Sequence, residues 1–219
     1  MRRPPFLLVL LLLAAAFLAA TVTRGTAEAT RVEARAPTCR TVARPKPRQE
    51  TRKPPTTRLD ARRSYDVVVA TSCGSFTIRL DVKDSPRLAA SFVSLARSGF
   101  YDHTIFHRIV PGFVIQGGDP TQTGDGTPGY QTVDKVPPKT RYVEGVVAMA
   151  KTQTDPAGAS GSQFFVVTGA DVGLPPIYAL LGRVTRGIAV VRLIGKLGDP
   201  TTQLPTRVIT IDRVSVKES

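Results

Sequence analysis

The stretch F-H-R-I-V-P-G-F-V-I-Q-G-G-D, residues 106–119, decides how this chain folds. It consists of two short apolar runs that are separated by a Pro-Gly pair and followed by two glycines. Proline and glycine break regular structure and favour a turn. The pattern therefore predicts two short strands, 105–110 and 113–116, that are joined at residues 111–112.

Arg108 is the unusual residue in this stretch. Strand alternation predicts Phe106, Arg108 and Val110 on one face of the first strand. His107 and Ile109 then lie on the other face. An arginine that shares a face with apolar side chains can lay its stem along the core and keep its head in water. It can also point into a ligand groove, and the stretch alone leaves both possibilities open.

The residues on either side of this stretch predict a mainly β domain with two helices. Asp84-Ser85-Pro86 is typical of a helix start, and apolar residues recur at helical spacing until Gly99. The expected strands are 65–70, 76–80, 145–150, 163–167, 178–184 and 207–216, with a turn at Gly74-Ser75 between the first two. A second helix is expected at 187–193. Glycine-rich loops are expected at 117–129 and 152–161, and an irregular segment at 130–142. Many short strands with two helices predict a β-barrel or sandwich whose ends the helices cover.

The N-terminal segment has the pattern of an export signal. Arg2 and Arg3 precede an apolar run at residues 6–22, and Ala27-Glu28-Ala29 has the small residues that precede a cleavage site. Residues 1–29 are therefore expected to be a secretory signal peptide. The run of about 17 residues is at the short edge of what spans a bilayer, so an uncleaved membrane anchor and tether is the alternative.

Residues 30–63 are rich in proline, arginine and lysine and poor in apolar residues. Such a composition cannot repay the entropy of ordering, so it predicts a disordered, extended tether in front of a folded domain at 64–219. The segment 1–63 holds 14 Lys and Arg against 4 Asp and Glu, whereas 64–219 holds 16 against 13. Because positive and negative residues are nearly equal in number in the domain itself, the net charge of +13 gives no support to a specific nucleic-acid-binding domain.

The chain has two cysteines, Cys39 in the proposed tether and Cys73 in the domain. In an exported chain an even number of cysteines allows a disulfide, which would attach the tether to the domain. The alternative is a buried Cys73 and a free Cys39. Their spacing predicts no metal site.

The sequence lacks the residue patterns of covalent and metal-dependent catalysis. Its two histidines, His103 and His107, belong to no zinc motif. Gly161-Ser162-Gln163 lacks the second glycine of a nucleophile elbow, and the chain contains no phosphate-binding loop motif. We therefore expect no metal and no cofactor.

Arg108, Gln116 and Gln163 among apolar residues are sufficient for one reaction. Rotation about an X-Pro peptide bond breaks no covalent bond, and its barrier of about 18–20 kcal/mol arises from amide resonance. The proline nitrogen gains a lone pair as the amide twists, and a permanently charged arginine can donate a hydrogen bond to it. Such a site needs no group with a catalytic pKa.

Four blocks of the sequence resemble the cyclophilins, the cyclophilin-type peptidyl-prolyl cis-trans isomerases, and the N-terminal segment suggests a bacterial exported type. The blocks are Phe106 to Asp119, Val147-Ala148-Met149-Ala150, Gly161-Ser162-Gln163-Phe164-Phe165, and Tyr178-Ala179-Leu180-Leu181-Gly182-Arg183-Val184. They occur in the family's order and span most of residues 65–216. The resemblance implies a closed eight-stranded antiparallel β-barrel that is capped by two α-helices.

The resemblance also assigns roles to individual residues. The implied catalytic residues are Arg108, Phe113 and Gln116, and the implied substrate-binding residues are His107, Val114, Ala150, Lys151, Gln163, Phe165, Leu174 and Tyr178. Arg108 would contact the prolyl nitrogen, and Gln116 would orient it. Phe113, Val114, Phe165 and Leu174 would hold the proline ring, while Gln163 and the backbone near Lys151 would bind the residues before proline.

Several positions depart from the family's pattern. Val114 replaces a common methionine, Lys151 an asparagine and Tyr178 a histidine. Gly173 stands where eukaryotic members often have tryptophan, which predicts weak cyclosporin binding with isomerase activity retained. The loop 152–161 is longer than in compact members.

These observations predict an exported isomerase that acts on proline-containing polypeptides. We expect a monomer located outside the cytoplasm, either secreted or anchored to the outer face of the cytoplasmic membrane. Two other functions are compatible with these observations, one that uses the same site residues and one that uses the basic N-terminal segment. One is a cyclophilin-like peptide-binding module or chaperone without turnover, and the other is an adhesin for anionic surfaces. An intact set of Arg108, Phe113, Gln116 and Phe165 favours the enzyme.

Overall fold

The computed structural model describes residues 36–219. The expected signal peptide or anchor at 1–29, including its apolar run, lies outside the described residues. Within 36–219, no helix is long and apolar enough to cross a membrane.

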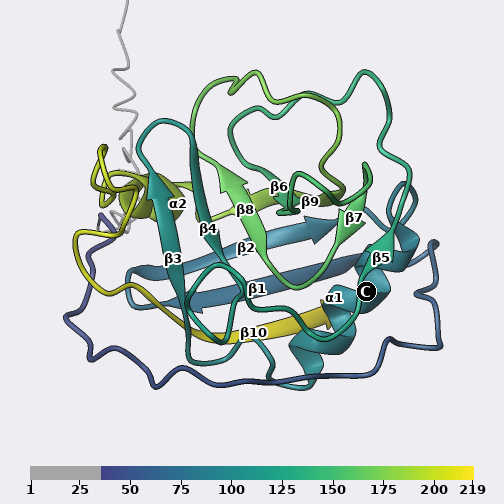
Figure 1. Cartoon of the computed structure of the whole chain (residues 1–219), viewed down its shortest axis with the longest axis horizontal. Helices are drawn as coiled ribbons and strands as arrows, with labels where there is room; N and C mark the ends of the chain where they lie inside the picture. Colours follow the sequence, from purple (N-terminus) through teal and green to yellow (C-terminus); the bar gives the residue numbers. More distant parts are fainter. Residues whose placement is uncertain (1–35) are drawn as a thin grey trace, which may run out of the picture. The chain divides into compact units, whose positions relative to one another are not determined.

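The described chain forms a closed barrel of eight antiparallel strands with two α-helices (Figure 1), which confirms the predicted fold class. The order around the barrel is β1-β10-β3-β4-β8-β6-β9-β2. The strands are β1 Tyr65–Thr71, β2 Gly74–Leu80, β3 Thr104–Val110, β4 Val114–Gly117, β6 Val146–Met149, β8 Phe164–Val167, β9 Leu180–Arg186 and β10 Thr210–Glu218. All eight barrel strands coincide with predicted strands to within a few residues at each end.

Alternation explains which side chains fill the barrel. In β1, Val67 and Val69 are fully buried, and in β2, Phe76 and Ile78 are buried in the same core. The residues between them face outward, as the period of two requires. The predicted turn at Gly74-Ser75 is wrong by two positions, because residues 72–73 make the turn and Gly74 already pairs with Thr71.

Two helices pack against the barrel. Helix α1, Pro86–Arg97, buries Leu88 and Phe92 completely. The Phe92 ring stacks on Tyr101 at 4.7 Å between centroids and meets Phe164 edge-on at 5.7 Å. Helix α2, Ile188–Gly195, packs near β2, β3 and β4. These aromatic and aliphatic contacts form one continuous core.

A second, two-stranded sheet lies outside the barrel. It pairs β5, Thr132–Val133, with β7, Ala159–Ser160. The sequence predicted an irregular segment and a loop there, because strands of two residues are too short to show an alternating pattern. Gly158 makes the close approach possible, since a Cβ at this position would lie 1.8 Å from the carbonyl oxygen of Asp134.

Residues 36–63, here called the N-terminal strap, run along the outside of the barrel without helix or strand (dark blue in Figure 1). The composition predicted a disordered, extended tether, whereas the strap is attached to the barrel at several points. Cys39 forms a disulfide with Cys73. Further along, the backbone N–H of Arg48 donates to the carbonyl of Pro120 (2.9 Å), and that of Arg52 donates to Pro128 (2.8 Å). Backbone hydrogen bonds, a disulfide and the packing of Cys39 and Leu59 against the core thus hold a segment that is poor in apolar residues.

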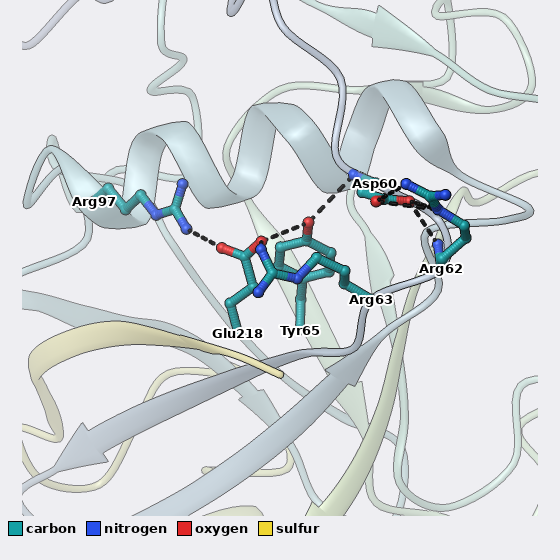
Figure 2. Close-up of polar contacts among 6 residues, drawn as sticks. All are labelled: Asp60, Arg62, Arg63, Tyr65, Arg97 and Glu218. Atoms are coloured by element: carbon teal, nitrogen blue, oxygen red, sulfur yellow. Dashed lines mark hydrogen bonds and ion pairs between the residues drawn. The ribbon is translucent and has the colours of Figure 1, made fainter.

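The end of the strap is held at the end of the last strand. Glu218 of β10 accepts hydrogen bonds from Arg63 (2.8 Å), from the hydroxyl of Tyr65 (3.1 Å) and from Arg97 of α1 (3.1 Å), as Figure 2 shows. The Tyr65 hydroxyl in turn accepts the backbone N–H of Asp60 at 3.2 Å. One carboxylate therefore joins the strap, the first and last strands and helix α1.

Candidate active site

The outward position of Arg108 results from a β-bulge in β3. Phe106 pairs with Gly117 and Arg108 with Gln116, so the β3 register shifts by one residue at His107. The simple alternation expected for this strand is therefore wrong. Phe106 is fully buried in the barrel core, whereas Arg108 is only partly buried on the outer face. The extra residue of the bulge places the side chains of Phe106 and Arg108 on opposite faces of the strand.

The guanidinium of Arg108 is fixed by two side-chain amides. Its Nε donates to Oε1 of Gln203 at 2.8 Å, and its Nη1 donates to Oε1 of Gln116 at 3.3 Å. Within residues 36–219, Nη2 makes no hydrogen bond. Burial lowers the pKa of Arg108 from its ordinary value, but the guanidinium remains protonated at neutral pH. The site therefore presents an oriented cation with a free donor.

Hydrogen bonds connect Gln116, through Gln163, to a loop. Nε2 of Gln116 donates to Oε1 of Gln163 at 3.0 Å. Nε2 of Gln163 then donates to the carbonyls of Gly124 (2.7 Å) and Gly126 (3.0 Å). The loop at 119–126 thus determines how Gln163 is oriented, and through Gln116 it affects Arg108.

Asp119 organises this loop. Its buried carboxylate accepts backbone N–H groups of Thr121 and Gly124, both at 2.7 Å, and of Gly126 at 3.3 Å. Burial alone would raise the pKa of Asp119, but the hydrogen bonds lower it on balance. Only glycine fits at position 126, because a Cβ there would lie 1.8 Å from the carboxylate. Asp119 ends the stretch 106–119, and the sequence alone gave no signal for this role.

Nine of the eleven predicted site residues line one cavity of about 310 Å³. They are Arg108, Phe113, Val114, Gln116, Ala150, Lys151, Phe165, Leu174 and Tyr178. The cavity lies outside the barrel, over a small cluster of apolar side chains that is separate from the main core. The cavity therefore combines apolar side chains, which can hold a proline ring, with two cations, Arg108 and Lys151.

Tyr142 supports one wall of the cavity and was not predicted. Its hydroxyl donates to the carbonyl of Tyr178 (2.7 Å) and accepts the backbone N–H of the same residue (3.0 Å). The Tyr178 ring meets Phe165 edge-on, with 5.6 Å between centroids. Burial raises the pKa of Tyr142 to about 12, so its hydroxyl keeps the proton that it donates. The segment 130–142 appeared irregular in sequence and gave no signal for this contact.

The two remaining predicted residues, Gln163 and His107, do not line this cavity. Gln163 lines an adjoining pocket of about 180 Å³, whose walls also include Gln116, Ala150 and Lys151. His107 lines neither cavity and is buried, with its ring close to Gly124 of the loop at 119–126. Burial lowers the pKa of His107, and the nearby charge of Arg108 acts in the same direction while Asp119 opposes it. A neutral His107 is therefore expected beside the cation.

The arrangement suits a reaction without covalent chemistry. Within residues 36–219, no group of three or more His, Cys, Asp or Glu side chains is placed to hold a metal ion. The apolar side chains of the cavity can hold a proline ring beside the guanidinium of Arg108, which lines the same cavity. A donor aimed at charge that appears only as the amide twists favours the transition state over the ground state.

Comparison with known families identifies the family of this domain. The sequence model of one family, the cyclophilin type peptidyl-prolyl cis-trans isomerases, matches residues 66–216 of this chain. The chain belongs to the cyclophilin family. As in the members of that family, the chain combines the eight-stranded barrel with peptidyl-prolyl cis-trans isomerase activity.

Relatives of this cyclophilin are found in several eukaryotes. The peptidyl-prolyl cis-trans isomerase CYP18-2 of Arabidopsis thaliana is 35% identical over 155 residues, which cover 69% of this chain and 93% of the relative. The peptidyl-prolyl cis-trans isomerase-like 1 of Neurospora crassa has the same identity and coverage. In both comparisons the matched part includes nearly the whole relative.

A solved structure provides the same comparison in three dimensions. The cyclophilin type isomerase of Cryptosporidium parvum, crystallised in the presence of the dipeptide Ala-Pro, superposes with a TM-score of 0.64 and 29% identity. The superposition covers 69% of this chain and 98% of that protein. The superposition therefore includes nearly the whole of that protein.

Proposed function

We propose that this cyclophilin accelerates rotation about X-Pro bonds in exported polypeptides, as a bacterial-type enzyme outside the cytoplasm. The observation that carries the catalytic part is the guanidinium of Arg108. Two amides hold it at the edge of an apolar cavity, and its Nη2 is left without a hydrogen-bond partner among residues 36–219.

The substrate class follows from the cavity. Proline is the only residue whose side-chain ring closes on its own backbone nitrogen, so a ring held against Phe113 and Phe165 brings that nitrogen close to the cavity wall. Arg108 then donates to the nitrogen when it becomes pyramidal and gains a lone pair. The presence of Ala-Pro with the Cryptosporidium parvum relative supports a proline-containing peptide as the substrate.

The disulfide between Cys39 and Cys73 supports the proposed location. Disulfides persist in oxidising compartments and are rare in the cytosol. The basic and apolar pattern of residues 1–29 agrees with export. In such a compartment slow prolyl isomerisation can limit the folding of newly exported chains.

Expression of the whole chain in an exporting bacterial host tests the location. Mass spectrometry of the protein recovered outside the cytoplasm should show a chain that begins after Ala29 and is two hydrogens lighter than the fully reduced form. An uncleaved chain in the cytoplasm with two free thiols would contradict the proposal.

A further inference from the structure

A loop beyond helix α2 contributes a side chain to the catalytic arginine. Gln203 lies between α2 and β10, 95 residues from Arg108 in sequence, and its Oε1 accepts Nε of Arg108 at 2.8 Å. This distance is shorter than the 3.3 Å between Arg108 and Gln116. Both hydrogen bonds come from the same cation, and by its distance the Gln203 contact is the tighter of the two.

The backbone of Gln203 has an unfavourable conformation. Its φ angle is +60°, a region that side chains other than glycine rarely adopt. Residues in this region persist when surrounding contacts hold them in place. In this loop the contacts are the N–H of Gln203 to the carbonyl of Asp199 (2.8 Å) and the N–H of Ile109 to the carbonyl of Gln203 (2.9 Å).

The loop is also docked tightly on β3. A Cβ at Gly198 would lie 2.2 Å from the carbonyl oxygen of Ile109, so this glycine permits a close approach. The Asp199 carboxylate accepts the N–H groups of Thr201 (2.9 Å) and Thr202 (2.7 Å), which closes the turn before Gln203. The amide of Gln203 therefore reaches Arg108 from a loop that is fixed to the strand carrying the arginine.

We propose that Gln203 is a positioning residue for the isomerase reaction. It and Gln116 hold the guanidinium from two sides, through Nε and Nη1, and so direct Nη2 toward the peptide bond in the cavity. With Gln116 alone, the guanidinium could rotate about its single remaining contact. A loss of orientation at the reacting group lowers the rate even when binding is unchanged.

The test uses three substitutions in the whole chain. Gln203→Gly removes the amide and relieves the backbone, because glycine adopts positive φ without strain. Gln203→Met keeps the length of the side chain but lacks the amide oxygen, and Gln203→Glu keeps an acceptor of the same reach. We expect kcat/KM for a proline peptide to fall about ten-fold in the first two variants, through kcat with KM nearly unchanged, and to recover largely in Gln203→Glu.

Two measurements separate positioning from a structural role. The melting temperature of Gln203→Gly should equal or exceed that of the unaltered protein. In NMR spectra the Arg108 Nε–H should exchange slowly with solvent in the unaltered protein and faster in this variant. His103→Gly is the matched control, since His103 also has positive φ (+57°) but is exposed and lines neither cavity. A Gln203→Gly variant with kcat/KM within two-fold of the unaltered protein would overturn the proposal, as would unchanged exchange at Nε.

Discussion

The side-chain amides of Gln116 and Gln163 lie head to tail, with Nε2 of Gln116 donating to Oε1 of Gln163 over 3.0 Å. This contact determines the orientation of both amides. Because Gln116 uses its nitrogen for Gln163, its oxygen faces Arg108. The loop that binds Gln163 thus contributes to the orientation of the catalytic cation.

Gln163→Leu should lower kcat/KM without unfolding the protein. The substitution leaves Nε2 of Gln116 and two loop carbonyls without their partner. We expect a loss of about ten- to a hundred-fold in kcat/KM and about 1–3 kcal/mol in the free energy of unfolding. A coupled peptide assay and urea denaturation measure the two effects. Gln153→Leu, an exposed position, is the control, and equal activity in the two variants would contradict the role of Gln163.

Asp119→Asn should destabilise the loop at 119–126 and change the response to acid. The folded protein lowers the pKa of Asp119 below 3.8, so the stability it contributes is present above that pH and is lost as the pH falls through the folded value. We expect the free energy of unfolding at pH 7 to fall by about 2–3 kcal/mol, since a charged acceptor is lost. The exposed Asp125→Asn serves as the control. Identical acid unfolding curves for the two variants would refute this role.

Reduction of the disulfide between Cys39 and Cys73 should release the N-terminal strap. The bridge spans 34 residues, and a crosslink of this length contributes about 3–4 kcal/mol in the chain-entropy model. The Cys39→Ser, Cys73→Ser double variant should melt at a lower temperature. Trypsin should cut it first after Arg40 or Arg44, whereas the oxidised protein resists. Equal cleavage of both forms would show that the strap is held without the bridge.

His107 should stay neutral as the pH falls through the range in which a free histidine is protonated. Its pKa is lowered from 6.5 by burial, so below pH 6.5 the unfolded chain binds more protons than the folded one. The free energy of unfolding should therefore decrease as the pH falls from 6.5 toward the lowered value, and His107→Asn should weaken this dependence. NMR titration of the ring protons gives the pKa directly. A value at or above 6.5 would contradict this account.

Much of the fold was predictable because its strands are local patterns. Alternating apolar residues in β1 and β2 and the proline at the start of α1 give signals that depend on neighbours in sequence. The bulge at His107 and the paired residues of β5 and β7 were not predictable, because they depend on the register between distant strands.

The site residues also fall into a group that was predictable from the sequence and a group that was not. Arg108, Gln116 and Gln163 lie in sequence blocks with family resemblance, and the structure brings them into one hydrogen-bonded chain. Tyr142 and Gln203 come from segments without a regular pattern, and they reach the site only because the barrel brings their loops there. Their contributions follow from tertiary packing alone.

The most direct test of the account is the rate of cis-trans isomerisation of a proline peptide by the protein and by its Arg108→Lys variant. Lysine keeps the charge but cannot donate to two amides and the peptide at once from a planar group. We predict that kcat/KM falls by about a hundred-fold or more, while the melting temperature stays the same. Arg141→Lys, an exposed arginine outside the site cavity, should leave the rate unchanged. An Arg108→Lys variant that retains the rate of the unaltered protein would contradict the central role of the oriented guanidinium.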